Sequence, residues 1–383
     1  MSRKVVHVAL NGVTGRMGYR QHLVRSLLSI REQGGVQLTD GTLAYPEPVL
    51  VGRSEQRLRA IAERHGLERW TTSLDEVLAD PAVQVYFDTQ VTSAREPALA
   101  RAIAAGKHIY TEKPVADSLE GAVRLAAAAR EAGVINGVVQ DKLFLPGIIK
   151  LRRLIRDGFL GRVLSVRLEF GYWVFEGDSI AAQRPSWNYR KEDGGGIVLD
   201  MFPHWQYLLE DLFGPIAALY ARHATHLPQR WDESGAPYDV TADDAAYALL
   251  EFESGVLASV NSSWAVRVNR RELVELHVDG THGSAVAGLR NCAVQHRVNT
   301  PMPVWNPDLP DPNDYLAQWT DVPDNASFDN GFKVQWEQFL QHAVEGRPFP
   351  WDLAAGAKGV QLACLALQSS AEGRRLEVPR LAT

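Results

Sequence analysis

The chain has 383 residues, which is more than a single hydrophobic core usually holds, so we expect two domains. Hydrophobic residues make up 45% and charged residues 22% of the chain, the balance of an ordinary globular protein. The formal net charge of −6 and the lack of a basic run argue against nucleic acid or an anionic membrane surface as the main partner.

Signals for metal binding or export are weak. Cys292 and Cys364 are too few for a disulfide framework and lack the spacing of a metal site, which fits a reducing cytoplasm and predicts no metal. The N-terminal residues lack the long apolar core of a signal peptide, and no stretch reaches the roughly 18 apolar residues of a membrane span. We therefore expect a cytoplasmic protein without a membrane partner.

The first part of the chain alternates between predicted strands and predicted helices. Short apolar, β-rich runs predict strands, and capped or alanine-rich segments predict helices. The expected strands are residues 5–10, 49–51, 83–87, 108–110 and 134–139, and the expected helices follow Gly18, Ser54 and Ser73 and span residues 98–105 and 121–132. Residues 34–48 contain two prolines, and we interpret them as an insertion that delays the second strand. The alternation implies an α/β fold with a parallel, doubly wound sheet.

The pattern changes after residue 141, and we place a domain boundary there, between residues 1–141 and residues 142–383. Runs typical of long strands, separated by turns, predict a mostly antiparallel sheet with one face covered by helices. The expected strands are residues 164–172, 245–252, 256–264 and 273–278, and the expected helices include residues 151–156, 335–344 and 354–373. Residues 301–330 are rich in Pro, Asp and Asn and are expected to form a surface loop.

A glycine-rich turn joins the first predicted strand to the first predicted helix. Gly12 allows a tight turn, Gly15 lets the backbone approach a pyrophosphate, and Gly18 lets the helix pack closely on the sheet. The helix N-terminus then holds the anionic pyrophosphate. We expect a dinucleotide at Gly12, Thr14, Gly15, Arg16 and Met17; an ordinary glycine-rich turn is the alternative.

The end of the second predicted strand carries no acid for a ribose 2′-hydroxyl. Instead the chain has Arg53 and Ser54, and Arg53 suits a 2′-phosphate, which favours NADP over NAD. The alternative is that Arg53 is a solvated loop residue.

Lys113 follows a predicted strand and precedes Pro114, which restricts Lys113 to extended conformations at the edge where open α/β sheets bind ligands. A partly buried lysine there is able to share a proton with a substrate hydroxyl, and Glu112 is a candidate to hold its orientation. A solvated loop lysine is the alternative.

Asp200 and His204 lie four residues apart on a predicted helix, residues 197–213, and so share a face. Imidazole has a pKa of about 6.5, which suits a general acid or base, and Asp200 would orient the ring or contact the substrate. Gly194–Gly196 would let the backbone approach a ligand, and Pro203 would delay or bend the helix. The alternative is a buried histidine hydrogen-bonded to an aspartate, and no third ligand suggests a metal.

Taken together, these motifs resemble the glucose–fructose oxidoreductase / inositol dehydrogenase (Gfo/Idh/MocA) family. The resemblance rests on the glycine turn, on the run from Ala105 to His108 leading to Glu112-Lys113-Pro114, and on Gly194–Gly196 followed by Asp200 and His204. It implies a Rossmann domain followed by an α/β domain with a large, mostly antiparallel open sheet. It also implies a homo-oligomer, a dimer or a tetramer, that associates through that sheet.

The family resemblance gives roles to three residues: Lys113 as the catalytic lysine, His204 as the acid/base, and Asp200 as the carboxylate on the same helix. Members transfer a hydride between a nicotinamide and a secondary alcohol or ketone of a sugar, polyol or cyclitol. We therefore expect an NAD(P)-dependent oxidoreductase with a small sugar or polyol substrate.

Some positions depart from the family pattern. The second glycine of the turn is displaced to Gly15, and the family's Thr-Pro after the fourth strand is Thr89-Gln90. A nearby histidine is replaced by Arg95, and an aspartate that many relatives carry three residues after the histidine is Tyr207. These changes bear on the substrate rather than on the reaction type.

Two further segments are candidates for the walls of the site. Gln140, Asp141 and Lys142 end the last Rossmann strand, and we expect them to face the nicotinamide or the substrate. We also expect cofactor contacts at Thr89, Gln90, Glu112 and Lys113. Trp187, Tyr189 and Arg190 suit stacking on a polyol and hydrogen bonding to it, with a core aromatic anchor as the alternative.

Three other functions stay open at this point. They are a glycoside-cleaving enzyme that oxidises its sugar transiently with bound NAD, a reductase of an imine or unsaturated substrate, and a non-catalytic sensor that binds NADP.

Overall fold

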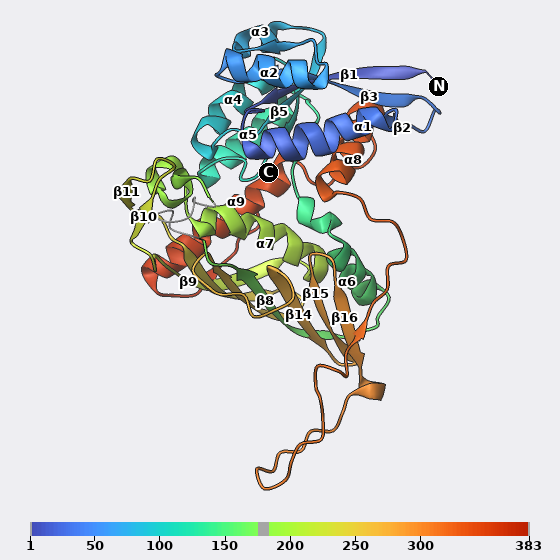
Figure 1. Ribbon diagram of the computed structural model, residues 1–383, viewed down its shortest axis with the longest axis vertical. Helices are drawn as coiled ribbons and strands as arrows, with labels where there is room; N and C mark the ends of the chain where they lie inside the picture. Colours follow the sequence, from blue (N-terminus) through green and yellow to red (C-terminus); the bar gives the residue numbers. More distant parts are fainter. Residues whose placement is uncertain (1, 175–183, 382–383) are drawn as a thin grey trace.

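The computed structural model describes residues 2–174 and 184–381, which form two sheets with helices packed on them (Figure 1). Five strands of the first sheet run parallel, in the order β3-β1-β5-β6-β7. They are β1 (Arg3–Asn11), β3 (Leu43–Val51), β5 (Val83–Asp88), β6 (His108–Thr111) and β7 (Asn136–Val138). Two short strands, β2 (Val36–Gln37) and β4 (Trp70–Thr71), pair with β3. The doubly wound parallel sheet predicted from the sequence is confirmed.

Helices cover both faces of this sheet. The turn after β1 leads into η1 (Met17–Leu28), which has π-type winding and continues as α1 (Ser29–Glu32). The remaining helices are α2 (Glu55–His65), α3 (Leu74–Ala79), α4 (Thr92–Ala104) and α5 (Leu119–Glu131). The hydroxyls of Ser54, Ser73 and Ser118 accept backbone N–H groups at the starts of α2, α3 and α5, as helix-capping serines do. The expected start of α4 at residue 98 was too late, because its first turns bury the polar side chains Thr92 and Arg95, which an apolar pattern misses.

The prediction that residues 34–48 form an insertion before the second strand was wrong. Residues 43–51 pair continuously with β1, and β2 folds back on them as a short hairpin. Alternate residues of a strand direct their backbone groups to opposite neighbours. The backbone N–H of Leu50 bonds the oxygen of Arg69, on the side of β3 away from β1. Pro46 and Pro48 are four and two residues before Leu50, so their backbone nitrogens point to the same side. No described strand pairs with them there, so their missing N–H groups break no sheet bond.

The second sheet contains nine strands among the described residues, in the order β17-β16-β15-β14-β8-β13-β12-β9-β18. Its neighbours are antiparallel except for β8 and β13. The strands are β8 (Val163–Gly171), β9 (Ile216–Ala224), β12 (Ala245–Phe252), β13 (Leu257–Ser263), β14 (Val274–Gly280), β15 (Gly283–Gly288), β16 (Cys292–His296), β17 (Thr320–Asp321) and β18 (Leu376–Glu377). The expected large, mostly antiparallel sheet is confirmed, although β9 and β15–β18 were not expected, because they are short or lack a clear apolar alternation.

One face of the second sheet is covered by α6 (Pro146–Arg156), α7 (Ile197–Phe213) and α9 (Leu353–Glu372) (Figure 1). Pro203 neither delays nor ends α7. Asp243 holds the start of the helix, because its backbone oxygen accepts the N–H of Ile197 and its carboxylate accepts the N–H of Val198 at 2.8 Å. Smaller elements complete this half: η2 (Asp141–Phe144), η3 (Ser186–Tyr189), η4 (Lys191–Asp193), β10 (Gln229–Trp231), β11 (Pro237–Asp239) and η5 (Arg297–Asn299).

The C-terminal helices α8 (Gly331–Glu345) and α9 also pack on the first sheet. Trp336 and Phe339 of α8 are fully buried beside Tyr110 of β6, with the rings of Tyr110 and Phe339 stacked at 4.4 Å. The division of the chain between residues 141 and 142 stays a prediction. Helix α8 belongs to the second part of that division but packs on the sheet of the first part. Residues 301–319 extend beyond the second sheet with little regular structure, and Trp305 there is 99% exposed (Figure 1). None of the helices described here combines the length and apolarity needed to cross a membrane.

Candidate active site

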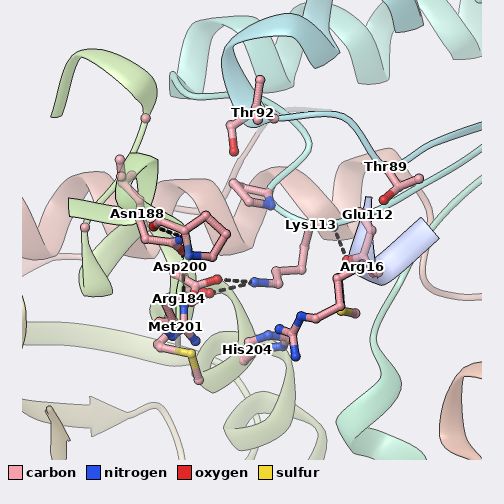
Figure 2. Close-up of a pocket in the computed structure, with 18 of the residues that line it drawn as sticks. Arg16, Thr89, Thr92, Glu112, Lys113, Arg184, Asn188, Asp200, Met201 and His204 are labelled. Carbon is pink, nitrogen blue, oxygen red and sulfur yellow. Dashed lines mark hydrogen bonds and ion pairs between the residues drawn. The ribbon is translucent and has the colours of Figure 1, made fainter. Parts of the chain in front are cut away.

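A cavity of about 560 Å³ lies where the C-terminal ends of the first sheet face α7 (Figure 2). The first sheet and its turns contribute one wall, and α7 with residues 184–196 contributes the other. The sequence-predicted residues that line it are Gly15, Arg16, Met17, Thr89, Gln90, Glu112, Lys113, Asp141, Lys142, Trp187, Gly194, Gly195, Gly196, Asp200 and His204. Residues far apart in the sequence therefore meet in one cavity.

The turn after β1 has the shape that a dinucleotide pyrophosphate requires. Gly12 has a φ of +85°, which favours glycine. A Cβ at Gly18 would lie 2.7 Å from the backbone oxygen of Gly12, so the start of η1 fits against the turn only without a side chain. The turn opens into the cavity through Gly15 and Arg16. These features fit a dinucleotide held at a helix N-terminus.

Lys113 and Asp200 form an ion pair across the cavity (Figure 2). The Lys113 ammonium donates to the Asp200 carboxylate at 2.7 Å and to the Asp200 backbone oxygen at 2.8 Å. Arg184 donates to the second carboxylate oxygen at 2.9 Å. Burial alone would raise the pKa of Asp200, but Lys113 and Arg184 outweigh burial and hold it below its usual range. Asp200 therefore stays ionised, and it binds the lysine rather than the imidazole of His204.

Glu112 holds the backbone of Lys113 rather than its ammonium. One carboxylate oxygen accepts the Lys113 N–H at 3.2 Å, and the other pairs with Nε2 of His22 at 2.8 Å. Trp336 donates its indole N–H to Nδ1 of His22 at 3.0 Å, so the His22 proton lies on Nε2 and is donated to Glu112. Burial would raise the pKa of Glu112, but the His22 hydrogen bond and nearby cations lower it below its ordinary value.

His204 is buried and its Nδ1 lies 2.7 Å from the hydroxyl of Tyr207. Tyr207 in turn lies 3.4 Å from a carboxylate oxygen of Asp141. Burial lowers the pKa of His204, and the cations Lys113, Lys142 and Arg184 lower it further. The imidazole is therefore neutral at pH 7, and a neutral imidazole is a general base. The partner of this ring is Tyr207, the residue that replaces the family's aspartate.

Arg95 fixes the two loops that carry Gln90 and Lys113. Its guanidinium contacts the carboxylate of Asp88 and donates to the backbone oxygens of Gln90 and Pro114. Asp88 is fully buried and also accepts the hydroxyl of Tyr86 at 2.7 Å. One buried ion pair thus ties the end of β5 to the loop after β6.

The remaining sequence-predicted site residues lie outside this cavity. Gly12 belongs to the turn but does not line the cavity, Gln140 donates its N–H to the side chain of Gln335 at 2.7 Å, and Ser54 caps α2. Arg53 is exposed at the end of β3, and Thr14 lines a second, smaller cavity.

Two of the predicted substrate residues, Tyr189 and Arg190, do not reach the main cavity. The Tyr189 ring is buried between Arg230 and Trp264, and the Arg190 guanidinium lies 4.7 Å from the ring centre of Tyr238. The aromatic-anchor alternative describes Tyr189, because its ring is buried and packs against Arg230 and Trp264. Gly195 also has a structural role, since a Cβ there would lie 2.5 Å from the backbone oxygen of Trp187.

Sequence reasoning missed Arg184, Tyr172 and His22. Arg184 donates to the hydroxyl of Tyr172 at 3.2 Å and covers the ring of Trp264 at 4.2 Å. No local pattern marks these residues, because their partners lie on distant elements. Among the described residues, no three or more His, Cys, Asp or Glu side chains gather closely enough to hold a metal ion.

We expect Arg95→Met to lower the free energy of unfolding at pH 7 by about 3–5 kcal/mol, because it leaves the buried Asp88 carboxylate without its cation. Burial raises the pKa of Asp88, and Arg95 offsets part of that rise. Without Arg95 the folded-state pKa rises further. A carboxyl raised in this way costs stability above its folded-state pKa, and the cost disappears as the pH falls below the unfolded value of about 3.9. Urea unfolding at several pH values should show the deficit shrinking toward acid.

The control adds Asp88→Asn to the same variant, which removes the uncompensated charge and should restore most of the stability. A deficit that is equal at all pH values and unaffected by Asp88→Asn would mean that lost packing, rather than the ion pair, is its cause.

Known proteins with similar sequences or structures belong to the family that this site suggests. Residues 7–140 match the oxidoreductase family with an NAD-binding Rossmann fold, and residues 148–286 match the GFO/IDH/MocA C-terminal domain. D-xylose dehydrogenase from Paenarthrobacter nicotinovorans is 57% identical over 381 residues, which cover 98% of each chain. 1,5-anhydro-D-fructose reductase from Ensifer adhaerens is 30% identical over 273 residues, which cover 70% of this chain and 74% of the relative.

A solved structure of levoglucosan dehydrogenase in complex with NADH and levoglucosan has the same fold, with a TM-score of 0.81 at 20% identity, covering 98% of this chain and all of that one. The glycine turn, the two sheets and the full-length similarity therefore lead to one conclusion: the chain is a sugar oxidoreductase of the Gfo/Idh/MocA family with an NAD-binding Rossmann domain.

Proposed function

We propose that this protein is a dehydrogenase that oxidises D-xylose or a closely related sugar with a nicotinamide dinucleotide as hydride acceptor. The observation that carries the proposal is the convergence of Lys113, Asp200 and His204 on one cavity beside the glycine turn. The 57% identity to a D-xylose dehydrogenase over nearly the whole chain supports the choice of sugar.

The proposed roles follow from protonation and position. The nicotinamide, when bound, accepts hydride from the carbinol carbon of the sugar. Lys113, fixed by two oxygens of Asp200, donates a hydrogen bond to the reacting oxygen. His204 is neutral, and its Nε2 accepts the hydroxyl proton. Asp200 is an acceptor only, because two cations keep it ionised, so its role is to hold Lys113 in place.

The sugar would lie against Tyr172, Trp187 and Asn188, which line the cavity opposite the Rossmann turns. An indole face suits the C–H face of a pyranose, and the amide and phenol groups suit its hydroxyls. Arg184 holds this wall together, since it donates to Tyr172, to the Asn188 side chain at 3.1 Å and to Asp200.

Purified protein mixed with D-xylose and NADP or NAD should produce the near-ultraviolet absorbance of the reduced nicotinamide. His204→Asn should lower kcat by about 10²-fold or more, because it removes the base that takes the substrate proton. His223→Asn, at an exposed position on β9, is the matched control and should keep full activity.

No change in absorbance in either direction, with D-xylose and a panel of related sugars, would sink the proposed reaction. Wild-type turnover by His204→Asn would sink the assigned role of the histidine. Sugar cleavage without net nicotinamide reduction would instead select the glycoside-cleaving alternative.

We also propose that NADP is preferred over NAD. Arg53 follows the end of β3, and a second cavity of about 260 Å³ is lined by Thr14 of the glycine turn and by Arg57 and Arg64 of α2. A Cβ built at Gly52 would lie 3.6 Å from the Thr14 methyl group, so the residues after β3 lie close to the glycine turn. Rossmann domains hold the adenosine ribose of a dinucleotide at the end of the second parallel strand, and guanidinium groups near that point suit a 2′-phosphate.

Arg57→Met should raise KM for NADP by about 10- to 100-fold, the equivalent of one lost charge-assisted hydrogen bond, and change KM for NAD by less than about threefold. Arg59→Met on the same helix is the control, because Arg59 pairs with Glu55 and does not line the cavity. An equal effect of Arg57→Met on both cofactors would contradict the preference.

The protein is further proposed to be a homo-oligomer that associates through the uncovered face of the second sheet. Large apolar side chains on that face are exposed: Tyr220, Tyr247, Leu249 and Leu257. Leu249 is 60% exposed and pairs across the strands with Tyr220, so these side chains form one patch. A second copy with the same patch would cover it in a two-fold interface.

Leu249→Asp should shift the protein to monomers in sedimentation velocity, because a carboxylate would be buried in the patch. Leu316→Asp, which is off the sheet and at a position already 85% exposed, should leave the assembly unchanged. A Leu249→Asp variant with the wild-type sedimentation coefficient would rule out this interface. The cytoplasmic location stays a prediction.

A further inference from the structure

The geometry around His204 points to a proton path that leads away from the substrate. We propose that Tyr207 and Asp141 form a relay with His204, so that the substrate proton enters the imidazole at Nε2 and an equivalent proton leaves from Nδ1. This inference rests on the proposed function, since it requires His204 to be the base.

The three groups are in series. Nδ1 of His204 lies 2.7 Å from the Tyr207 hydroxyl, and that hydroxyl lies 3.4 Å from Oδ1 of Asp141. The direct distance from Nδ1 to Oδ1 is 3.9 Å, which is too long for a hydrogen bond. Tyr207 is therefore the bridge between the imidazole and the carboxylate. Hydrogen bonds in an unliganded site are often long and shorten in the reacting complex.

We assign the protons so that each of these groups has a hydrogen-bond partner. The backbone N–H of Lys142 donates to the Tyr207 oxygen at 3.4 Å, so one lone pair of that oxygen is used. If Nδ1–H of His204 donates to the other lone pair, the Tyr207 proton points to Asp141 and every group has a partner. Burial and the charge of Asp141 raise the pKa of Tyr207 well above its ordinary value, so the phenol keeps its proton. In this arrangement Nε2 carries the free lone pair, and His204 lines the cavity.

The proposed proton transfer leaves no charge on the imidazole of His204. As hydride leaves the carbinol carbon for the nicotinamide, the substrate O–H bond breaks and its proton binds Nε2. The Nδ1–H proton passes to the Tyr207 oxygen, and the Tyr207 proton passes to Oδ1 of Asp141. His204 and Tyr207 end neutral, Asp141 ends protonated, and the carbonyl product forms. Asp141 lines the cavity, so it returns the proton to water when the product leaves.

The surrounding charges explain why a relay is needed. Three cations, Lys113, Lys142 and Arg184, act on the imidazole, and each opposes a positive charge on it. Asp141 places a carboxylate at the far end of this path, and its other oxygen lies 3.4 Å from the Lys142 ammonium. Passing the proton on lets His204 act as a base at a position where imidazolium is unfavourable.

Two substitutions test the relay with little change in volume. Tyr207→Phe and Asp141→Asn should each lower kcat for sugar oxidation by about 10- to 100-fold with KM within about threefold, because each interrupts the same path. The double variant should be no slower than the slower single variant. Tyr110→Phe is the matched control, since the buried Tyr110 hydroxyl has no hydrogen-bond partner among the described residues and lies in the core of the first sheet.

A solvent isotope effect separates proton transfer from mere packing. The wild-type kcat should fall in D₂O with a curved dependence on the deuterium fraction, because several protons move together. Tyr207→Phe should give a smaller, linear dependence. Wild-type kcat in Tyr207→Phe, or a double variant whose loss is the product of the single losses, would overturn the relay. If the wild-type protein reduces no nicotinamide with any sugar, the proposed function fails; if His204→Asn is inactive while Tyr207→Phe is normal in rate and isotope effect, only the relay fails.

Discussion

The ion pair between Lys113 and Asp200 is the contact on which the geometry of the site depends. Lys113 comes from the edge of the first sheet and Asp200 from α7, so the pair joins the two halves of the cavity (Figure 2). Both groups are largely withdrawn from water, and a lone buried charge would be costly. Arg184 compensates the second oxygen of Asp200, which makes the carboxylate a fixed acceptor. Neither half of the site is complete without the other.

The same charges decide which group handles the proton. With Asp200 held ionised by two cations and Glu112 held ionised by its hydrogen bonds, neither carboxylate is suited to take a substrate proton. His204 is neutral because it is buried near cations, so its lone pair is available, but the same cations oppose a lasting positive charge. The environment that makes His204 a base thus also requires an exit for the proton. Tyr207 occupies that position, one turn along α7.

Local patterns of apolarity and turn residues were sufficient to predict the parallel sheet, the glycine turn, and the positions of Lys113 after a strand and His204 on a helix. The roles of these two residues came from the family resemblance and stay proposals. The sequence was insufficient where the position of a residue depends on contacts with elements far away along the chain. Pro46 and Pro48 suggested an insertion, yet they lie in β3 because their missing N–H groups face an open edge. Tyr189 was predicted to contact the substrate, but Arg230 and Trp264 enclose its ring. No local pattern predicts that Arg184 reaches Asp200.

The C-terminal helix α8 has a direct link to the proposed catalytic lysine. The indole N–H of Trp336 fixes the tautomer of His22, His22 donates to Glu112, and Glu112 accepts the backbone N–H of Lys113. Each bond in this chain is between groups that are buried or nearly so, where unpaired polar atoms are costly. Because the tryptophan lies more than two hundred residues after the lysine, the backbone at Lys113 is fully held only after α8 has packed on the first sheet. The packing of α8 on the first sheet is therefore needed to fix the backbone of Lys113 in the site.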